Sequence, residues 1–458
     1  MRLNKDKINK LMKDKGISTQ TKLADIMKIT KNQLSVMLSA KYCPIKSNTL
    51  KLCEVLNTDI TQIIDMEDST EQVQMCLFEE ELELREESEV LNKDTLIDVT
   101  KVRANRIYNV VELFAGAGGL ALGLEKAGFE EAGLVELDKY ACATLKRNRP
   151  NWNVIQEDVI KVSENGIRNY IDSDIEIDLL SGGYPCQAFS YAGHKMGLED
   201  VRGTMFYYYA NILSQLRPKV FLAENVRGLV THDDGKTLQT MIEVFSSIGY
   251  NVQWKVHSAL NYGVAQKRER IIIIGTRNDL PAHIEFKYPK EYDYKPTLRD
   301  ALKDVPKSEG SKYPEKKKKV LDLVPPGGCW IDLPEDIAKE YMGNSYFSGG
   351  GKRGMARRIS WDEPCLTLTC SPAQKQTERC HPDETRPFTT REYARIQSFP
   401  DEWEFEGSVS QVYKQIGNAV PAELAKAIGL SIVDYLNKVE KKYNQRVNYN
   451  DEVAIEKN

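Results

Sequence analysis

The 458-residue sequence lacks paired cysteines, a long apolar run and a secretory leader. Its nine cysteines are scattered without a CxxC pair, and an odd number argues against a complete disulfide framework. The densest group, Cys365, Cys370 and Cys380 beside His381, has no standard zinc spacing, so free thiols are favoured and no metal is expected. No apolar run approaches the roughly 20 residues that span a bilayer, and no apolar segment follows the basic start. These absences indicate a cytoplasmic protein without a membrane partner.

The net charge is small, −4, but the charges are unevenly distributed along the chain. Residues 1–66 contain twelve Lys/Arg and six Asp/Glu, a net of +6. Residues 67–90 contain one Arg and ten acidic residues, a net of −9. The chain therefore begins with a basic module, and residues 67–105 are predicted to form an acidic, solvated linker.

Short helical patterns fill the basic module. Apolar residues recur at helical spacing in 3–11 and 23–27, and a further helix is expected over 30–38. A helix, a break and a second helix form the outline of a helix-turn-helix, and the module resembles the small repressor-type DNA-binding domains of bacterial regulators. Lys31, Asn32 and Gln33 would then begin the recognition helix, where side chains reach base edges. The alternative is a helical bundle that binds protein.

Beyond residue 105, apolar strand-like runs alternate with helix-length segments. The runs lie at 109–114, 132–136, 175–181, 219–223 and 270–275. This pattern is typical of an α/β fold with a mostly parallel sheet covered on both faces. It stops near 276, where the chain becomes rich in Pro, Gly, Lys and Tyr. We predict a catalytic domain at 106–276 that is completed by 386–440, an inserted module at 277–385, and a C-terminal tail at 441–458.

A glycine-rich loop, ELFAGAGGL at 112–120, follows the first of these strands. Glycines there let the backbone approach a ligand and turn into a helix. Glu136 follows the second strand, where an acid accepts hydrogen bonds from ribose hydroxyls. Asp158 follows the third, where a carboxylate can accept from an adenine amino group. Each signal is weak alone, but the ordered set indicates an adenosine-containing cofactor.

A cysteine stands on a loop after the next strand, in SGGYPCQAFS at 181–190. Ligands of open α/β folds bind at this edge, and a thiolate is a strong nucleophile that also leaves readily. Cys186 is thus a candidate nucleophile, although a lone cysteine is more often a small buried apolar residue. The following strand ends in Glu224 and Asn225, and alternation places Arg268 and Arg270 on one face of a later strand.

In this order, these blocks closely resemble those of the bacterial cytosine-5 DNA methyltransferases. The shared motifs are the FxGxG loop, the acid after the second strand, Asp-Val, Pro-Cys-Gln, Glu-Asn-Val and Gln-x-Arg-x-Arg, then TREYARIQSFP at 390–400 and QIGNAVP at 415–421. The resemblance covers about 110–436. It implies a Rossmann-like S-adenosylmethionine-dependent methyltransferase domain that methylates C5 of a cytosine flipped out of duplex DNA.

The resemblance also implies roles for individual residues. Cys186 would add to C6 of the cytosine, and Glu224, kept partly protonated by burial, would protonate N3. Asn225 would orient the strand end, and Arg270, supported by Arg268, would face the carbonyl oxygen. The cofactor would be bound by Phe114, Ala115, Gly116, Gly118, Gly119, Leu120, Glu136, Leu137, Asp158, Val159, Pro185, Asn418 and Ala419.

The inserted module at 277–385 would be the target-recognition domain. DNA contacts are expected from Gln187 and Ser190 beside the nucleophile, and from Arg353, Arg357 and Arg358 near a glycine run. An exposed arginine is, however, as often only a solvated charge.

The implied partner is double-stranded DNA, and the basic module would also bind the enzyme's own promoter. The protein would act as a monomer in the bacterial cytoplasm, at the nucleoid, beside a restriction endonuclease that shares its target sequence without binding to it. The alternatives are an RNA cytosine-5 methyltransferase of the same fold, a transcriptional regulator with an inactive methyltransferase portion, and a NAD dehydrogenase. The last gives no role to Pro-Cys-Gln or Glu-Asn-Val.

Overall fold

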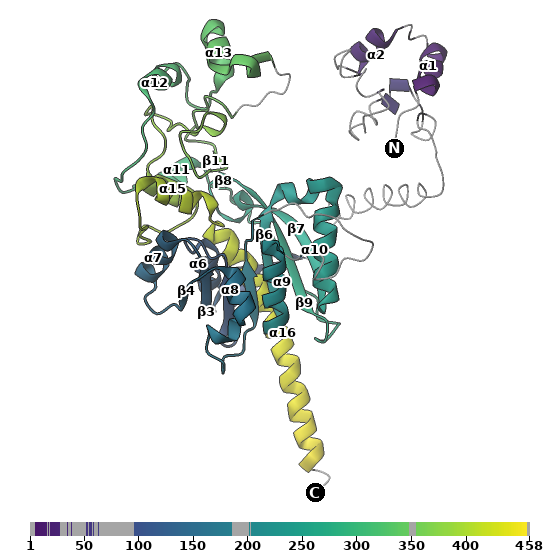
Figure 1. Cartoon of the computed structure of the whole chain (residues 1–458), viewed down its shortest axis with the longest axis vertical. Coiled ribbons are helices and arrows are strands. Elements are labelled where there is room, and N and C mark those ends of the chain that lie inside the picture. The colour runs from purple at the N-terminus through teal and green to yellow at the C-terminus, as the bar shows by residue number, and fades with distance from the viewer. Residues whose placement is uncertain are drawn as a thin grey trace. The chain divides into compact units, whose positions relative to one another are not determined.

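The computed structural model describes residues 5–15, 17, 19–27, separate positions between 34 and 63, and 96–455 apart from 186–200, 202 and 348–353 (Figure 1). Side chains are described as far as residue 442. Chain contacts divide the protein into two units, 1–92 and 93–458.

The first unit is a small helical module. Helices α1 (Lys5–Asp14) and α2 (Gln20–Ile26) both contribute to one buried apolar cluster. The cluster consists of Ile8, Met12, Ile17, Leu23, Ala24, Met27, Leu34, Leu38, Leu52, Leu56 and Ile63. The apolar spacing in the sequence therefore marks a core of this unit. Lys31, Asn32 and Gln33 lie outside the described residues.

Seven strands form the central sheet of the second unit. They are β2 (Tyr108–Leu113), β3 (Phe129–Glu136), β4 (Val154–Gln156), β5 (Leu179–Gly182), β6 (Val220–Val226), β7 (Tyr250–Ser258) and β9 (Glu269–Arg277), in the order β4-β3-β2-β5-β6-β9-β7. The strands from β4 to β6 pair in parallel, whereas β9 is antiparallel to both β6 and β7. The prediction of a mostly parallel sheet is confirmed. The sequence pattern missed β7, because an edge strand with half-exposed polar residues has no continuous apolar run.

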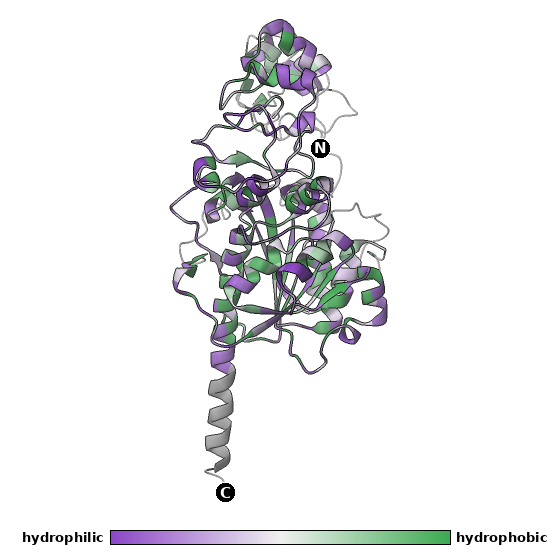
Figure 2. Cartoon of the chain, turned by 90° about the vertical axis from the view of Figure 1, so that its left-hand side faces the viewer, coloured by the Kyte–Doolittle hydropathy of each residue, from purple (hydrophilic) through white to green (hydrophobic). Residues whose placement is uncertain are grey.

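Helices cover both faces of this sheet. They are α6 (Gly119–Ala127), α7 (Lys139–Asn148), α8 (Val159–Asn165), α9 (Met205–Leu216), α10 (Lys236–Ser247) and α16 (Ala422–Ile455). Val110 and Leu222 pack against α6 and α16, whereas their neighbours Val111 and Phe221 pack against α8, α9 and α10. Successive side chains of a strand point to opposite faces, so continuous apolar runs supply two cores. Figure 2 shows the sheet mainly in the colour of apolar residues.

Close packing of α16 on α6 returns the C-terminal part of the chain to the first long strand. A Cβ atom on Gly123 of α6 would lie 2.3 Å from the Ala425 Cβ and 2.5 Å from the Ala422 carbonyl oxygen. At the start of α6, a Cβ on Gly119 would lie 2.2 Å from the Val420 carbonyl oxygen. Glycines at both positions let the backbones touch, which brings the chain around 420 beside the loop that follows β2.

One helical stretch in the described part of the chain, Val409–Lys442, is long and apolar enough by composition to cross a membrane. Of its most apolar window, 83% is buried inside the protein. Its apolar residues are therefore accounted for by packing in the core.

The remaining strands and α-helices lie before the sheet, around and within the insert, and in the segment that follows it. They are β1 (Leu96–Ile97), β8 (Gln266–Lys267), β10 (Tyr288–Pro289), β11 (Cys365–Leu366), α11 (Leu298–Leu302), α12 (Glu315–Leu321), α13 (Glu335–Met342), α14 (Thr390–Ile396) and α15 (Val409–Asn418). β1 pairs with β10, and β8 pairs with β11, both in parallel.

Four expected boundaries differ from the packing in the structure. Val99 belongs to the main core, and the partly buried Leu96 and Ile97 pack against it, so the packed structure begins at 96 and not at 106. Leu280 and Leu298 at one end of the insert, and Cys365 and Leu368 at the other, also pack in cores of the catalytic domain. The insert has an apolar cluster of its own, which spans a shorter stretch of chain than 277–385. It consists of Tyr313, Leu321, Val324, Leu333, Ala338, Ala356 and Cys380. The expected tail at 441–458 continues α16 as far as Ile455.

Candidate functional site

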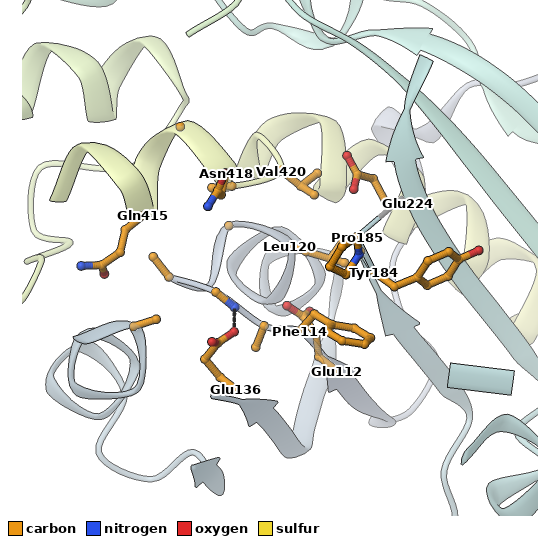
Figure 3. Close-up of a pocket in the computed structure, with 18 of the residues that line it drawn as sticks. Glu112, Phe114, Leu120, Glu136, Tyr184, Pro185, Glu224, Gln415, Asn418 and Val420 are labelled. Atoms are coloured by element: carbon orange, nitrogen blue, oxygen red, sulfur yellow. Dashed lines mark hydrogen bonds between the residues drawn. The ribbon is translucent and has the colours of Figure 1, made fainter. Parts of the chain in front are cut away.

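A cavity of about 530 Å³ opens where the strand order reverses between β2 and β5 (Figure 3). Ligands of open α/β sheets bind at this switch point, beyond the carboxyl ends of the strands. Nine of the residues expected to bind a cofactor line the cavity. They are Phe114, Ala115, Gly116, Gly119, Leu120, Glu136, Pro185, Asn418 and Ala419. Glu224, Asn225, Arg268 and Arg270, all expected in catalysis, line it too.

The loop after β2 forms one wall of the cavity. Phe114 and Gly116 both have left-handed backbones, with φ values of 58° and 54°, and a side chain in this conformation is uncommon outside constrained sites. The Gly116 N–H donates to Oε2 of Glu136 at 2.7 Å, and the Asp138 N–H donates to Oε1 at 2.7 Å. These two bonds hold the Glu136 carboxylate at the end of β3, beside the loop.

Four residues expected to bind the cofactor do not line the cavity. Asp158 instead caps α8, because its Oδ1 accepts from the Ile160 N–H at 2.9 Å. Leu137 is 65% exposed, whereas Val159 is buried in the core between the sheet and α8. Gly118 precedes α6 with a φ of 84°, and a Cβ there would meet Leu145 and Trp403.

Glu224 and Arg270 form an ion pair inside the cavity. Nε of Arg270 lies 2.7 Å from Oε1 of Glu224, and each side chain is only 12% exposed. Backbone register explains the pair, since β6 and β9 are antiparallel neighbours and both residues stand at the same end of the sheet. The Arg270 guanidinium therefore faces the Glu224 carboxyl group within the cavity.

Asn225 ties the end of β6 to the loop that leads to Cys186. Its Nδ2 donates to the Tyr184 carbonyl at 3.0 Å, and its Oδ1 accepts from the Val226 N–H at 2.9 Å. The Tyr184 ring is buried and packs against Phe206, which anchors the loop. The prediction that Asn225 orients this strand end agrees with these contacts. Cys186, Gln187 and Ser190 lie outside the described residues.

Arg268 joins the cavity to the C-terminal segment. Its guanidinium donates to the carbonyls of Leu368 at 3.3 Å and Gly417 at 3.0 Å, and the residue is 2% exposed. Burial, with the charge of Arg270 adding to it, lowers the pKa of Arg268 to about 9. Arg268 therefore supports the site by fixing two backbone segments.

Two further residues that line the cavity were not predicted from the sequence. Glu112, in the middle of an apolar strand run, is 1% exposed, and burial raises the pKa of its carboxyl. An acidic residue inside an apolar strand run is unusual, and this position could have identified Glu112 as a candidate site residue. Lys414 also lines the cavity and binds Oδ2 of Asp138 at 2.9 Å, so α15 is bridged to the end of β3. Helical spacing back from Asn418 places Lys414 on the same face and could have identified it.

Two arginines expected to bind DNA point inward. Arg357 forms a bidentate pair with Glu363 at 2.6 and 2.7 Å. Arg358 is 4% exposed and donates to carbonyl groups that include Val324 at 2.7 Å and Leu321 at 2.7 Å. Both guanidinium groups are used in holding the insert together, so the expectation of DNA contacts from them is wrong. Arg353 lies outside the described residues.

Comparisons with known proteins agree with this architecture. Residues 108–434 match the family of C-5 cytosine-specific DNA methylases, and residues 7–69 match a Cro/C1-type helix-turn-helix DNA-binding domain. The chain is 58% identical over 440 residues to the Type II methyltransferase M.Sau96I of Staphylococcus aureus, covering 96% of this chain and 100% of that protein. It is 50% identical over 428 residues to M.Eco47II of Escherichia coli, covering 92% and 100%.

Solved structures show the same fold. A putative DNA modification methyltransferase encoded in an Escherichia coli prophage superposes with a TM-score of 0.52 at 27% identity, covering 72% of this chain and 99% of that one. Spodoptera frugiperda DNMT2 superposes with a TM-score of 0.51 at 18% identity, over 71% and 99%. The second unit thus has the Rossmann-like methyltransferase fold, for which S-adenosylmethionine is the methyl donor. With the family match covering most of its length, the chain belongs to the C-5 cytosine-specific DNA methylases and carries a Cro/C1-type helix-turn-helix domain.

Proposed function

We propose that the protein methylates C5 of one cytosine within a short duplex DNA sequence, as the modification enzyme of a restriction-modification system, with Cys186 as nucleophile. The observation that carries the proposal is that Glu224, Arg270 and the loop leading to Cys186 reach the same cavity as the glycine loop after β2. The identity to two Type II methyltransferases over their full lengths supports the biological setting.

The cavity residues fit S-adenosylmethionine. The group supplies an electrophilic methyl when bound. Gly116 and Gly119 bring bare backbone to the cavity wall, Glu136 offers carboxylate oxygens to ribose hydroxyls, and Asn418 offers an amide. A volume of about 530 Å³ lies within the range of small-molecule sites.

Residues of the chain would act on the base in turn. Addition of the Cys186 thiolate to C6 breaks the conjugation of the ring and makes C5 nucleophilic. Glu224 would donate a proton to N3 as the thiolate adds, and Arg270 would stabilise charge on the carbonyl oxygen. Because these two side chains are already paired at 2.7 Å, an entering base meets donor and acceptor in a fixed relative position. After C5 is methylated, loss of the C5 proton and elimination of the Cys186 thiolate would restore the enzyme.

The experiment is bisulfite sequencing of plasmid DNA from a host without cytosine-5 methylation that expresses the protein. Methylated cytosines confined to one short sequence, and absent with Cys186→Ser, are expected. An unmethylated plasmid from folded, cofactor-binding protein would overturn the proposal and would favour an RNA substrate or a purely regulatory role.

We infer that the insert reads the target and that the enzyme acts as a monomer. Arg357 and Arg358 bind groups within the insert. We infer that lysines of α12 contact the DNA phosphates instead. Lys318 and Lys319 on α12 are exposed, and within the described residues neither forms an ion pair. Lys317, by contrast, is bound to Glu378.

We also propose that the helix-turn-helix domain binds DNA near the enzyme's own promoter and restrains expression. The family match at 7–69 and the +6 charge of residues 1–66 support this second activity. The full chain should shift a promoter fragment at low salt, and replacement of Lys31, Asn32 and Gln33 by alanine should abolish that shift while methylation remains. A wild-type chain that gave no shift would refute the proposal.

A further inference from the structure

Cys370 lies next to the cofactor cavity without lining it. Its thiol donates to Oδ1 of Asn418 at 2.8 Å. Asn418 ends α15 and lines the cavity, whereas Cys370 belongs to the segment that returns from the insert to the catalytic core. The contact therefore joins two parts of the chain 48 residues apart.

The backbone that carries Cys370 is firmly held. The Leu368 N–H donates to Oε1 of Gln266 at 3.0 Å, and the Thr369 carbonyl accepts from the Tyr393 hydroxyl at 3.1 Å. A Cβ on Gly417 would lie 2.6 Å from the Thr369 carbonyl carbon, so this segment packs directly on the end of α15. The thiol is thus offered to Asn418 from a fixed position.

This contact decides how the Asn418 amide is oriented. A primary amide has an accepting oxygen and a donating nitrogen, and rotation by half a turn exchanges them. The thiol occupies the oxygen, so Nδ2 remains to donate, and among the described residues it has no partner. Figure 3 shows the Asn418 nitrogen directed toward the glycine loop after β2.

We propose that Cys370 is a positioning residue for the cofactor. Its thiol holds the Asn418 amide with Nδ2 turned to an oxygen of bound S-adenosylmethionine, either carboxylate or ribose. The proposal rests on the assignment of Asn418 to the cofactor site. On this proposal, the segment that carries Cys370 at the end of the insert affects the affinity for the cofactor without touching the cofactor itself.

The test compares full-length Cys370→Ala, Cys370→Ser, Asn418→Ala and the Cys370→Ala/Asn418→Ala double variant. Calorimetry gives the Kd for S-adenosylmethionine, and steady-state assays give kcat and both KM values. Loss of one hydrogen bond predicts a threefold to tenfold weaker Kd for Cys370→Ala, on the order of 1 kcal/mol. The KM for DNA and the kcat at saturating cofactor should stay within about twofold of wild type.

Two comparisons separate positioning from a general packing effect. The hydroxyl of Cys370→Ser can donate to the same oxygen, so this variant should recover most of the affinity. In the Asn418→Ala background, Cys370→Ala should have no further effect. An unchanged Kd for Cys370→Ala, or an equal loss in both backgrounds, would overturn the role of Cys370 while leaving the cofactor site intact. An unchanged Kd for Asn418→Ala would overturn both assignments.

Discussion

Asn225 is a lining residue of the cavity whose amide group is used in two hydrogen bonds to neighbouring backbone. It donates to the Tyr184 carbonyl and accepts from the Val226 N–H, so the end of β6 is tied to the loop before Cys186. Small errors in the position of a nucleophile reduce reaction rates strongly, because attack needs a narrow range of distance and angle.

Replacement of Asn225 by Asp should therefore lower kcat by about tenfold to a hundredfold. The carboxylate keeps the bond from Val226 but faces the Tyr184 carbonyl without a proton to donate. Single-turnover methyl transfer at saturating cofactor measures the effect. Tyr184→Phe is the control, because it keeps the buried ring and the carbonyl, and it should retain activity within about twofold. Similar losses in both variants would contradict this account of Asn225.

Glu131 on β3 carries a buried carboxyl group that has no hydrogen-bond partner among the described residues. Burial raises its pKa well above the usual value, and the charges of Glu112 and Glu125 raise it further. The folded protein then binds a proton that the unfolded chain releases near pH 4.3. Stability is consequently lost as the pH rises from that value toward the folded pKa.

Replacement of Glu131 by methionine should remove this pH-dependent loss of stability. We expect the variant to be more stable than wild type at pH 8, by about 1–3 kcal/mol, and to show a smaller difference at pH 5. Chemical unfolding at the two pH values measures the change, with the exposed neighbour Glu130→Gln as control. A difference that did not depend on pH would show that the carboxyl is ionised or solvated in the folded state.

Residues of the site could be predicted from the sequence where a motif defines the course of the backbone. They could not be predicted where the role depends on whether the side chain is buried or exposed. Glu136 and Asn418 could be assigned because strand ends and a resemblance define their positions. Arg358 could not, because an arginine in a Gly-rich stretch gives no sign that carbonyl groups of its own module will surround it. The cap that Asp158 forms on α8 could not be foreseen, because capping a helix and binding a ligand require the same residue type at the same point.

At the scale of elements, the contact between α6 and α16 brings Asn418 and Ala419 to the glycine loop. Gly123→Ala should destabilise the protein by about 1–3 kcal/mol, since its Cβ would lie 2.5 Å from the Ala422 carbonyl and 2.8 Å from the Lys426 nitrogen. In an isolated helix the same change would be favourable by about 1 kcal/mol. Denaturant unfolding measures the difference. Gly228→Ala, where nothing lies within 4 Å, should have little effect, and equal stability of the two variants would refute the argument.

Helix α12 allows a second prediction at this scale. Replacing Lys318 and Lys319 by glutamine should weaken DNA binding and reduce the slope of log K against log salt by up to about two, one per lost phosphate contact. Titration of duplex DNA at several salt concentrations measures the slope. Glutamine at Lys303, an exposed lysine outside the helix, is the control. An unchanged slope would remove α12 from the DNA interface.

Most strands of the sheet could be predicted because continuous apolar runs alternate with helix-length segments along the chain. The edges of the insert could not, because its ends pack in the catalytic core while their sequences are irregular. Leu298 and Leu368 are buried in the same cluster although 70 residues separate them along the chain. A local pattern contains no information on such a pairing.

At the scale of the whole molecule, the two units have separate cores, and the second core begins before residue 99. A chain that starts at residue 93 should fold and methylate DNA. A chain that starts at 106 also loses Leu96, Ile97 and Val99, and it should be less stable by about 3 kcal/mol or more. Thermal unfolding and bisulfite sequencing of both truncations measure these outcomes. Equal melting temperatures would show that 96–105 is a linker after all.

The insert leaves and rejoins the catalytic domain at one place. β8 pairs with β11, and the N–H groups of Leu298 and Arg299 donate to the carbonyls of Glu363 at 2.9 Å and Trp361 at 3.0 Å. Since the cost of closing a loop rises only slowly with its length, the lobe between these anchored ends can be exchanged for one of another size without disturbing its surroundings. On the proposed role of the insert in reading the target, a change of DNA specificity needs a change in this lobe alone, while the residues around the cavity stay the same.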